Sequence, residues 1–316
     1  MANTTSNERV DVYTRVTDQI IKALELGIAN KWERPWRSTE TTFHYPVNVA
    51  TGKRYRGVNV IALWAESQLH GYAEARWGTF KQWSERGQSV AKGQKATFGV
   101  LWKPLDLETP NERSDDDHDG ETDRSRRWMS RAFPLFNAAQ IEGYEPPPEL
   151  PLPPQLQRIA HAEAFFSALG ADIRHGGNHA YYRKTSDHIQ MPPFAAFPDP
   201  LEYYSTLGHE ATHWVGAEHR LARDLTGRFG TESYAAEELI AELGAAFIAA
   251  DLGLSPDPRD ENTAYLDHWL KILKSDNRAI FTAASHAQRA ADYMHSFQAP
   301  VRPDFQHSTP QLTPCF

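Results

Sequence analysis

Two histidines and a glutamate near residue 210 have the spacing of a metal-dependent hydrolase. The stretch Leu207-Gly-His209-Glu210-Ala-Thr-His213 contains an H-E-x-x-H motif inside a helical pattern. Positions i and i+4 of a helix share one face, so His209 and His213 can present two imidazole nitrogens to one metal ion. Glu210 can then hold and deprotonate a metal-bound water as the general base. Paired histidines also occur as ordinary surface or core residues, so a purely structural interpretation stays open.

A catalytic zinc ion needs a third protein ligand, and the next long helical pattern, from about Ser233 to Leu252, supplies the candidates. With Ser233 as N-cap, Glu237 and Glu238 fall in the first turn, where the helix dipole favours carboxylates. Glu242 lies mid-helix among small and apolar residues, where an unpaired carboxylate is costly. We therefore assign Glu242 as the third ligand and Glu238 as the hydrogen-bond partner of a histidine. The reverse assignment stays open. The expected ion is Zn²⁺, with Mn²⁺ as the alternative.

Local signals indicate how these side chains are positioned. Asp199 followed by a proline has the pattern of a helix N-cap and first turn, and Gly216 lies near the end of the H-E-x-x-H helix. Gly244 and Ala245 lack bulky side chains, so the two helices can approach each other closely. The sequence thus predicts a pair of crossing helices with the candidate ligands at their contact.

Composition indicates a soluble globular protein. Hydrophobic residues make up 40% and charged residues 23% of the 316 positions, and that length is enough for two domains with separate cores. The single cysteine, Cys315, excludes an intrachain disulfide. Because no apolar run is long enough to span a bilayer and residues 1–10 lack a signal-peptide core, we expect a cytoplasmic protein with no membrane partner.

Charge is divided unevenly along the chain. Residues 1–104 hold 15 Lys and Arg against 9 Asp and Glu, which gives this part a net charge of +6. Because the whole chain has a net charge of −8, residues 105–316 must carry −14. Six of the nine tryptophans also lie in this basic part. Basic charge interleaved with aromatic rings is typical of surfaces that bind single-stranded nucleic acid. The alternative is that most of these tryptophans are core residues.

Periodicity and turn residues divide the chain into two domains of α+β class. Between strands expected at 89–104 and 128–136, residues 106–127 are dense in charge and are expected to be a disordered insertion or a long hairpin loop. A Pro-rich linker at 146–154 separates a first domain, 1–145, from a second domain, 155–300, and 301–316 is expected to be a tail. The predicted helices cover 11–26, 59–69, 79–87, 155–169 and two segments within 263–297. Short extended pieces between 172 and 191 predict a small antiparallel sheet.

Two sets of motifs, in order along the chain, resemble the ArdC family of antirestriction proteins. In the second half they are Tyr203-Tyr204-Ser-Thr-Leu-Gly-His-Glu-Ala-Thr-His-Trp, Arg220-Leu-Ala-Arg223 and Tyr234-Ala-Ala-Glu-Glu-Leu-Ile-Ala-Glu. In the first half they are Tyr55-Arg-Gly-Val-Asn, Trp77-Gly-Thr-Phe-Lys-Gln-Trp and Val90-Ala-Lys-Gly-Gln-Lys. The first half also resembles the single-stranded-DNA-binding domain of TraC-type plasmid primases.

This resemblance implies an N-terminal α+β module that binds single-stranded DNA, followed by a mostly helical, zincin-like metallopeptidase domain. It also implies protection of incoming plasmid or phage DNA from host restriction, with a host protein or a component of the restriction system as a second partner. In related zincins the ligand glutamate is followed by x-x-Ala, and both Glu242 with Ala245 and Glu238 with Ala241 fit that pattern. The expected DNA contacts are Trp32, Lys53, Tyr55, Arg56, Trp77 and Lys92.

Three functions therefore compete. The first is a zinc-dependent peptidase that is directed by single-stranded DNA, with Glu210 as the catalytic base. The second is a DNA-occluding binding protein whose metal site is structural and has no peptidase activity. The third is a cytoplasmic peptidase without a DNA role, which the net charge of residues 1–104 disfavours. The complete H-E-x-x-H motif favours the first over the second, because a purely structural site does not require Glu210.

Overall fold

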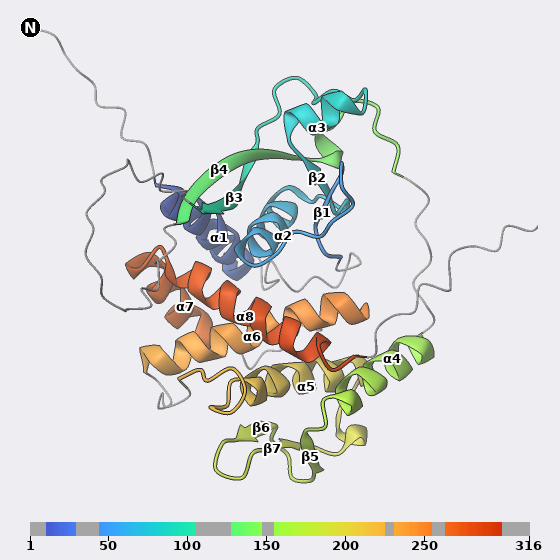
Figure 1. Ribbon diagram of the computed structural model, residues 1–316, viewed down its shortest axis with the longest axis vertical. Coiled ribbons are helices and arrows are strands. Elements are labelled where there is room, and N and C mark those ends of the chain that lie inside the picture. Colours follow the sequence, from blue (N-terminus) through green and yellow to red (C-terminus); the bar gives the residue numbers. More distant parts are fainter. Residues whose placement is uncertain are drawn as a thin grey trace, which may run out of the picture.

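The computed structural model describes residues 11–29, 44–104, 128–146, 155–224, 231–254 and 263–298. An N-terminal half of helices and strands packs on a mostly helical C-terminal half, and a small sheet lies at the far end of the molecule (Figure 1). This arrangement confirms the predicted α+β class with two domains. In the described ranges, no helix has the length and apolar character needed to span a bilayer. The expected insertion at 106–127, most of the linker, the tail and Trp32 lie outside these ranges.

The N-terminal half is a four-stranded sheet with two helices on the face that points toward the C-terminal half (Figure 1). The strand order is β1-β2-β4-β3, with β1 parallel to β2 and the other pairs antiparallel. The elements are α1 (Val12–Ala29), β1 (Val47–Asn48), α2 (Val58–His70), β2 (Arg76–Gly78), α3 (Phe80–Glu85), β3 (Thr97–Pro104), β4 (Trp128–Asn137) and η1 (Ala138–Gln140).

Local capping signals placed most helix ends correctly. α2 ends at Gly71, which adopts the left-handed conformation with φ of 66°. α3 begins after Thr79, whose hydroxyl accepts a hydrogen bond from the backbone N–H of Gln82, while the Gln82 amide oxygen accepts one from the Thr79 N–H. α1 continues to Ala29, three residues beyond the predicted range 11–26, and so includes Gly27. One glycine destabilises a helix by only about 1 kcal/mol, which packing of α1 against α2 can offset.

β3 and β4 form the long antiparallel hairpin that the sequence predicted. Thr97 pairs with Leu135 at one end and Pro104 with Trp128 at the other, so the charge-dense segment leaves and re-enters at the tip of one continuous ladder. Leu135 is fully buried and Val100 is 3% exposed. The insertion can therefore vary in length without disturbing the register, because that register is set by the buried face of the hairpin.

The C-terminal half is built from helices α4 (Gln155–Ala168), α5 (Pro200–Val215), α6 (Glu232–Leu252), α7 (Thr263–Ser275) and α8 (Ala279–His295), with the short helix η2 (Phe194–Ala196). Asp199 caps α5 as predicted, since its carboxylate accepts a hydrogen bond from the Leu201 N–H at 2.8 Å. The N-cap of α6 is Thr231 rather than the predicted Ser233, which moves the start of the helix back by two residues.

α5 and α6 cross closely because small residues meet at the crossing. A Cβ atom added to Gly244 would lie 2.6 Å from both Cγ2 and Oγ1 of Thr212. Gly208 faces the backbone of Ala245 in ordinary van der Waals contact, with a built Cβ 3.7 Å from the Ala245 Cα. The predicted close approach at Gly244 and Ala245 is confirmed, and it brings the two sets of candidate ligands together.

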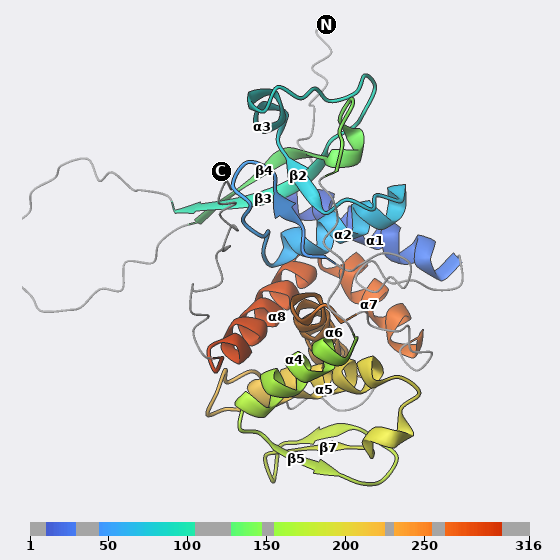
Figure 2. The ribbon, with the colours of Figure 1, turned by 90° about the vertical axis from the view of Figure 1, so that its right-hand side faces the viewer.

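The C-terminal sheet is mixed, whereas we predicted it to be antiparallel. β7 (His188–Met191) lies in the centre, parallel to β5 (Asp172–His175) and antiparallel to β6 (Tyr181–Arg183). Ile189 and Met191 are fully buried, and the sheet lies below α4 and α5 (Figure 2). The central place goes to the strand with the largest buried apolar face. β5 must then pair with β7 and not with its neighbour in sequence.

A single buried cluster joins the two halves. Trp64 on α2 contacts Phe247 on α6 with ring centroids 5.8 Å apart, and Tyr45 lies 6.1 Å from the same ring. Around this apolar contact, Arg54 pairs with Asp251. Domains joined by polar contacts alone tend to move relative to one another, whereas an apolar interface restrains them. The shared cluster therefore favours a fixed arrangement of the two halves.

Candidate metal centre

α5 aims both motif histidines at one point. Their Nε2 atoms lie 3.2 Å apart, and their rings meet at 78° with centroids 4.9 Å apart. Two nitrogens bound to one tetrahedral ion at bond lengths of about 2.0–2.1 Å stand about 3.3 Å apart. The separation of His209 and His213 therefore matches that of two ligands sharing an ion.

Glu238 completes this group. Its Oε2 lies 3.4 Å from Nε2 of His209, and its Oε1 lies 3.5 Å from Nε2 of His213. The ligand atoms of these three residues all lie within 4.8 Å of one another, and the residues are partly buried. Two neutral imidazoles and one carboxylate are a usual protein ligand set for catalytic zinc, with one position open to water or substrate. The residues present thus fit a divalent metal ion.

Glu242, which we preferred as third ligand from the sequence, lies on the other side of the His209 ring. Its Oε2 is 3.6 Å from Nδ1, the nitrogen that faces away from the Nε2 cluster. Glu242 is 1% exposed and lies one turn beyond Glu238 on α6. A carboxylate at Nδ1 accepts the ring proton and directs the lone pair of Nε2 toward a metal. The geometry therefore reverses the preferred order and favours the alternative assignment.

His213 has an equivalent partner that the sequence did not reveal. Glu237 Oε1 lies 3.1 Å from Nδ1 of His213, and Arg223 donates to both oxygens of Glu237, from Nη2 at 2.7 Å and from Nε at 3.2 Å. The Arg223 side chain is 2% exposed and also donates from Nη2 to the Thr212 carbonyl. The only sequence signal for this arrangement was the Arg220-Leu-Ala-Arg223 motif, to which no role had been given.

Close packing holds Arg223 in place. A Cβ atom on Gly216, the residue that ends α5, would lie 2.6 Å from Nη2 of Arg223. Gly216 has φ of −73°, so the requirement for glycine here is the close approach and not the backbone conformation. The glycine that was expected to end the helix therefore also makes room for the guanidinium that fixes Glu237.

The carboxylates around His209 and His213 stabilise positive charge at this site. Burial by itself lowers the pKa of His213, but hydrogen bonds to Glu237 and Glu238 outweigh it and raise that pKa to about 10. Burial likewise lowers the pKa of His209, while hydrogen bonds to Glu238 and Glu242 raise it above its usual value. The negative charge of Glu210 acts in the same direction on both imidazoles. A cation, whether a proton or a metal ion, is therefore favoured between these side chains.

Glu210 lies beside this group in a protected position. It follows His209 on α5 and is 8% exposed. A carboxylate next to an open metal position is placed to accept a proton from a bound water. The structure thus brings together His209, His213, Glu238, Glu242 and Glu210, as the sequence predicted for the group as a whole.

The candidate DNA contacts in the described ranges come from separate segments of the N-terminal half. Lys53, Tyr55 and Arg56 lie between β1 and α2, whereas Lys92 lies in the turn between α3 and β3. Lys53 and Lys92 are exposed. The Tyr55 hydroxyl accepts a hydrogen bond from Asn48 Nδ2, and burial raises the pKa of this phenol to about 12.

Two of these candidates have structural partners instead. Trp77 is 1% exposed and packs with Leu63 and Leu135, so its indole cannot stack on a base in this fold, and its assignment as a DNA contact is corrected. The exposed guanidinium of Arg56 pairs with Asp292 on α8, across the contact between the two halves. Trp77 is therefore a core residue, which was the alternative interpretation of the tryptophans in the basic part of the sequence.

Comparisons with known proteins divide the chain in the same way. Residues 10–136 match the sequence model for the N-terminal domain of anti-restriction factor ArdC, and residues 160–286 match that for a zincin-like metallopeptidase. The protein y4eC of Sinorhizobium fredii is 48% identical over 92% of this chain and 93% of its own length. Two DNA primases TraC of Escherichia coli are 36% and 35% identical over 90% of this chain, which spans only 20% and 27% of their lengths.

Two solved structures of antirestriction protein ArdC from plasmid R388 have the same fold. The metal-free structure is 39% identical, with a TM-score of 0.70, over 91% of this chain and 97% of that one. The Mn(II)-bound structure is 37% identical, with a TM-score of 0.72, over 92% of this chain and all of that one. Sequence identity at this level over both domains, together with the shared fold, shows that the chain belongs to the family of the antirestriction protein ArdC.

Proposed function

We propose that this protein is a metal-dependent peptidase that is directed by single-stranded DNA and protects incoming plasmid or phage DNA from host restriction. The observation that carries the catalytic part is the triangle of His209, His213 and Glu238, whose edges of 3.2, 3.4 and 3.5 Å match ligands around one ion. Membership of the ArdC family supports the antirestriction role.

His209, His213 and Glu238 would hold the ion, with Glu242 and Glu237 accepting the Nδ1 protons of the two histidines. We propose Zn²⁺ as the ion, with Mn²⁺ as the alternative because the R388 relative has been solved with Mn(II). Both ions accept imidazole and carboxylate ligands, and availability in the cell decides between metals more often than the affinity of a site does.

The chain's own residues supply the proton transfers of peptide hydrolysis. A bound divalent ion would polarise the scissile carbonyl and make a bound water more acidic. Glu210 would accept a proton from the attacking water as the water oxygen adds to the carbonyl carbon. Glu210 would then return the proton to the amide nitrogen as the C–N bond breaks, and the second proton of the water would pass from the new carboxylic acid to the amine, which leaves a carboxylate and an ammonium group. The Nδ1 partners Glu242 and Glu237 keep both imidazoles in the tautomer that binds through Nε2.

The N-terminal half would hold the DNA through exposed cations, with Lys53 and Lys92 as phosphate contacts. Tyr55 and Arg56 stay candidates, the latter only where DNA displaces Asp292. Contacts to phosphate are salt-dependent and largely independent of sequence, which suits a protein that must bind any incoming strand. The second partner would be a host protein or a component of the restriction system, cleaved near the bound DNA.

An alternative function is DNA occlusion with a structural metal and no hydrolysis. Glu210 argues against it, because a structural site is complete without a buried carboxylate next to the open position. The test compares the wild type with Glu210→Gln for metal content, single-strand affinity and cleavage of casein with and without an oligonucleotide. We expect one metal ion per chain and equal DNA affinity in both proteins, with cleavage in the wild type alone. Equal residual cleavage in both proteins would remove the catalytic part of the proposal.

The antirestriction part needs a cellular measurement. Conjugative transfer of an unmodified plasmid into a restricting host, with and without this protein, measures protection directly. We expect higher transfer with the wild type, and a non-restricting host serves as the control. If Glu210→Gln protects as well as the wild type, DNA occlusion is sufficient and the alternative is preferred.

A further inference from the structure

A pocket of about 320 Å³ lies in the N-terminal half, away from the metal centre. Val47 of β1 and Val49 of the following turn form an apolar wall, and the segment after η1 contributes Tyr144 and Glu145. This volume is at the lower end of the range for small-molecule sites. It suits a group the size of one nucleotide and is too small for a segment of folded protein.

Part of the polar lining is already committed to the fold. The Asn48 amide accepts hydrogen bonds from the backbone N–H groups of Ala50 and Thr51 and donates to the Tyr55 hydroxyl. Arg76 pairs with Glu74 at 2.7 Å. These contacts make the wall of the pocket rigid but leave those side chains little capacity for a ligand.

Three other polar side chains of the lining are uncommitted. Arg86, Gln88 and Glu145 make no side-chain hydrogen bond or ion pair with any residue in the described ranges. Together they offer a planar guanidinium, an amide that both donates and accepts, and a carboxylate that accepts. Unpaired nucleobases are recognised by hydrogen bonds along their edges and by stacking on aromatic or guanidinium planes.

Tyr144 supplies a ring in a fixed orientation. It meets Trp83 edge-on, with centroids 5.8 Å apart at 83°. Trp83 is fully buried, and its indole N–H donates to the Phe136 carbonyl at 3.1 Å. Burial raises the pKa of the Tyr144 phenol, which the positive charges of Arg76 and Arg86 partly oppose, so both guanidiniums act on this hydroxyl.

Charge at the pocket favours a base over a phosphate. The cations Arg76 and Arg86 are matched by the carboxylates of Glu74 and Glu145, so the pocket carries little net charge. A phosphate that binds to Arg86 would also be repelled by the Glu145 carboxylate. A base amino group, in contrast, can donate to that carboxylate.

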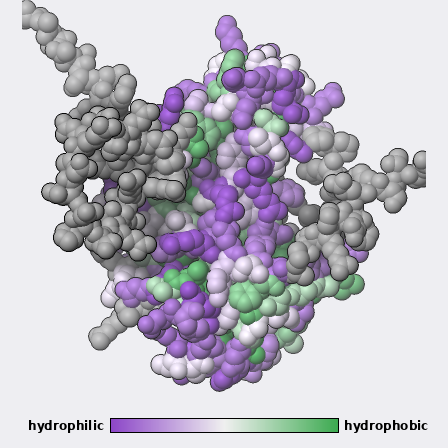
Figure 3. Space-filling view, in the orientation of Figure 1, coloured by the Kyte–Doolittle hydropathy of each residue, from purple (hydrophilic) through white to green (hydrophobic). Residues whose placement is uncertain are grey.

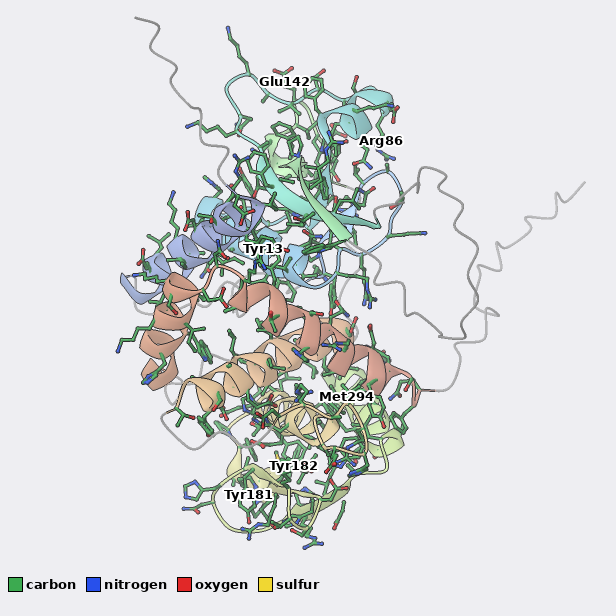
Figure 4. The ribbon with its side chains drawn as sticks, turned by 60° about the vertical axis from the view of Figure 1, so that its left-hand side comes forward. Tyr13, Arg86, Glu142, Tyr181, Tyr182 and Met294 are labelled. Carbon is green, nitrogen blue, oxygen red and sulfur yellow. The ribbon has the colours of Figure 1, made fainter. Side chains whose placement is uncertain are left out.

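We propose that this pocket receives one unpaired base of single-stranded DNA, stacked on Tyr144 or Arg86 and hydrogen-bonded by Gln88 and Glu145. This inference rests on the proposed binding of single-stranded DNA by the N-terminal half. The end of the molecule that carries α3 is mostly hydrophilic on the face seen in Figure 3. Arg86 lies at that end, far from Tyr181 and Tyr182 of the C-terminal sheet (Figure 4). The base would thus be held at the opposite end from the zincin sheet.

The test measures the binding of labelled dT, dC and dA homopolymers by fluorescence anisotropy across salt concentrations. Gln88→Ala removes no charge, so its salt dependence should equal that of the wild type. Its affinity should fall by about tenfold, the order expected for losing contacts to one base, and the loss should differ between homopolymers. Arg86→Gln should also weaken binding, whereas Arg289→Gln, the same change at an exposed residue of α8, should not.

Three other outcomes would contradict the proposal. A uniform loss in Arg86→Gln with a shallower salt slope, and no loss in Gln88→Ala, would indicate a phosphate contact and overturn the base pocket. Wild-type affinity in both variants would overturn it too, while the proposed DNA binding stands. If the wild type binds no single strand, both proposals fail. Thermal unfolding checks that each variant folds, and Glu145→Gln, at an exposed residue, is a second variant for the same readout.

Discussion

The order of the two glutamates on α6 is open to a direct test with Glu238→Gln and Glu242→Gln. Glu238 lies within 3.5 Å of both Nε2 atoms, whereas Glu242 reaches only Nδ1 of His209 at 3.6 Å. Loss of a carboxylate that orients a ligand weakens metal binding by about 10- to 100-fold. Glu242→Gln should fall in that range. Glu238→Gln leaves two protein ligands, fewer than a catalytic zinc site has, and should lose far more affinity.

The assay is Zn²⁺ competition with a chromophoric chelator, supported by elemental analysis of the purified proteins and repeated with Mn²⁺. Glu85→Gln is the matched control, because this exposed side chain on α3 pairs only with Lys81 in the described part of the chain. We expect wild-type affinity for the control, a measurable but weakened site in Glu242→Gln, and no stoichiometric metal in Glu238→Gln. The opposite order for the two α6 variants would refute the ligand assignment made from the geometry.

Three further predictions concern the surroundings of the site. Arg223→Ala removes the buried cation that donates to both oxygens of Glu237 and leaves only His213 beside that carboxylate. Urea denaturation should therefore show a loss of about 3 kcal/mol, and a loss below about 1 kcal/mol would contradict this role. Gly244→Ala places a methyl group against Thr212 and should cost about 1–3 kcal/mol in the same assay. Adding Thr212→Ala to Gly244→Ala should restore most of the lost stability. If Gly244→Ala alone has the stability of the wild type, α5 and α6 can separate without cost. Asp292→Asn removes the carboxylate that pairs with Arg56. The affinity for single-stranded DNA should therefore rise, with a steeper salt dependence, and unchanged binding would exclude Arg56 as a DNA contact.

Much of the fold could be predicted because its signals are local. The Asp199 cap was predicted at its observed position, and the predicted helices 59–69 and 79–87 end and begin close to Gly71 and Thr79, because each of these signals depends on a few consecutive residues. The pairing of β3 with β4 was also predicted, since two apolar alternating segments flank one charged insertion. The direction of β5 could not be predicted, because the choice of its neighbour depends on which strand buries the most apolar surface against α5.

The burial of tryptophans was likewise beyond the sequence. Trp77 lies in a basic, aromatic segment, yet it packs against Leu63 on α2 and Leu135 on β4. The sequence showed an aromatic residue among cations, which is equally compatible with a stacking platform and with a core. The contact with Leu135, more than fifty residues further along the chain, decided between them.

By itself, the sequence determined which side chains can hold a metal. His209, His213 and Glu210 were predicted from helical spacing, and two glutamates one turn apart on the next helix were the candidates to face them. Only the tertiary structure shows which glutamate lies at the Nε2 atoms of both histidines. Glu238 and Glu242 share a face of α6 and differ by about 6 Å along its axis, a difference that the local pattern cannot register. The contact of Gly244 with Thr212 sets the position of α6 against α5, and it places Glu238 at the Nε2 atoms and Glu242 behind the His209 ring.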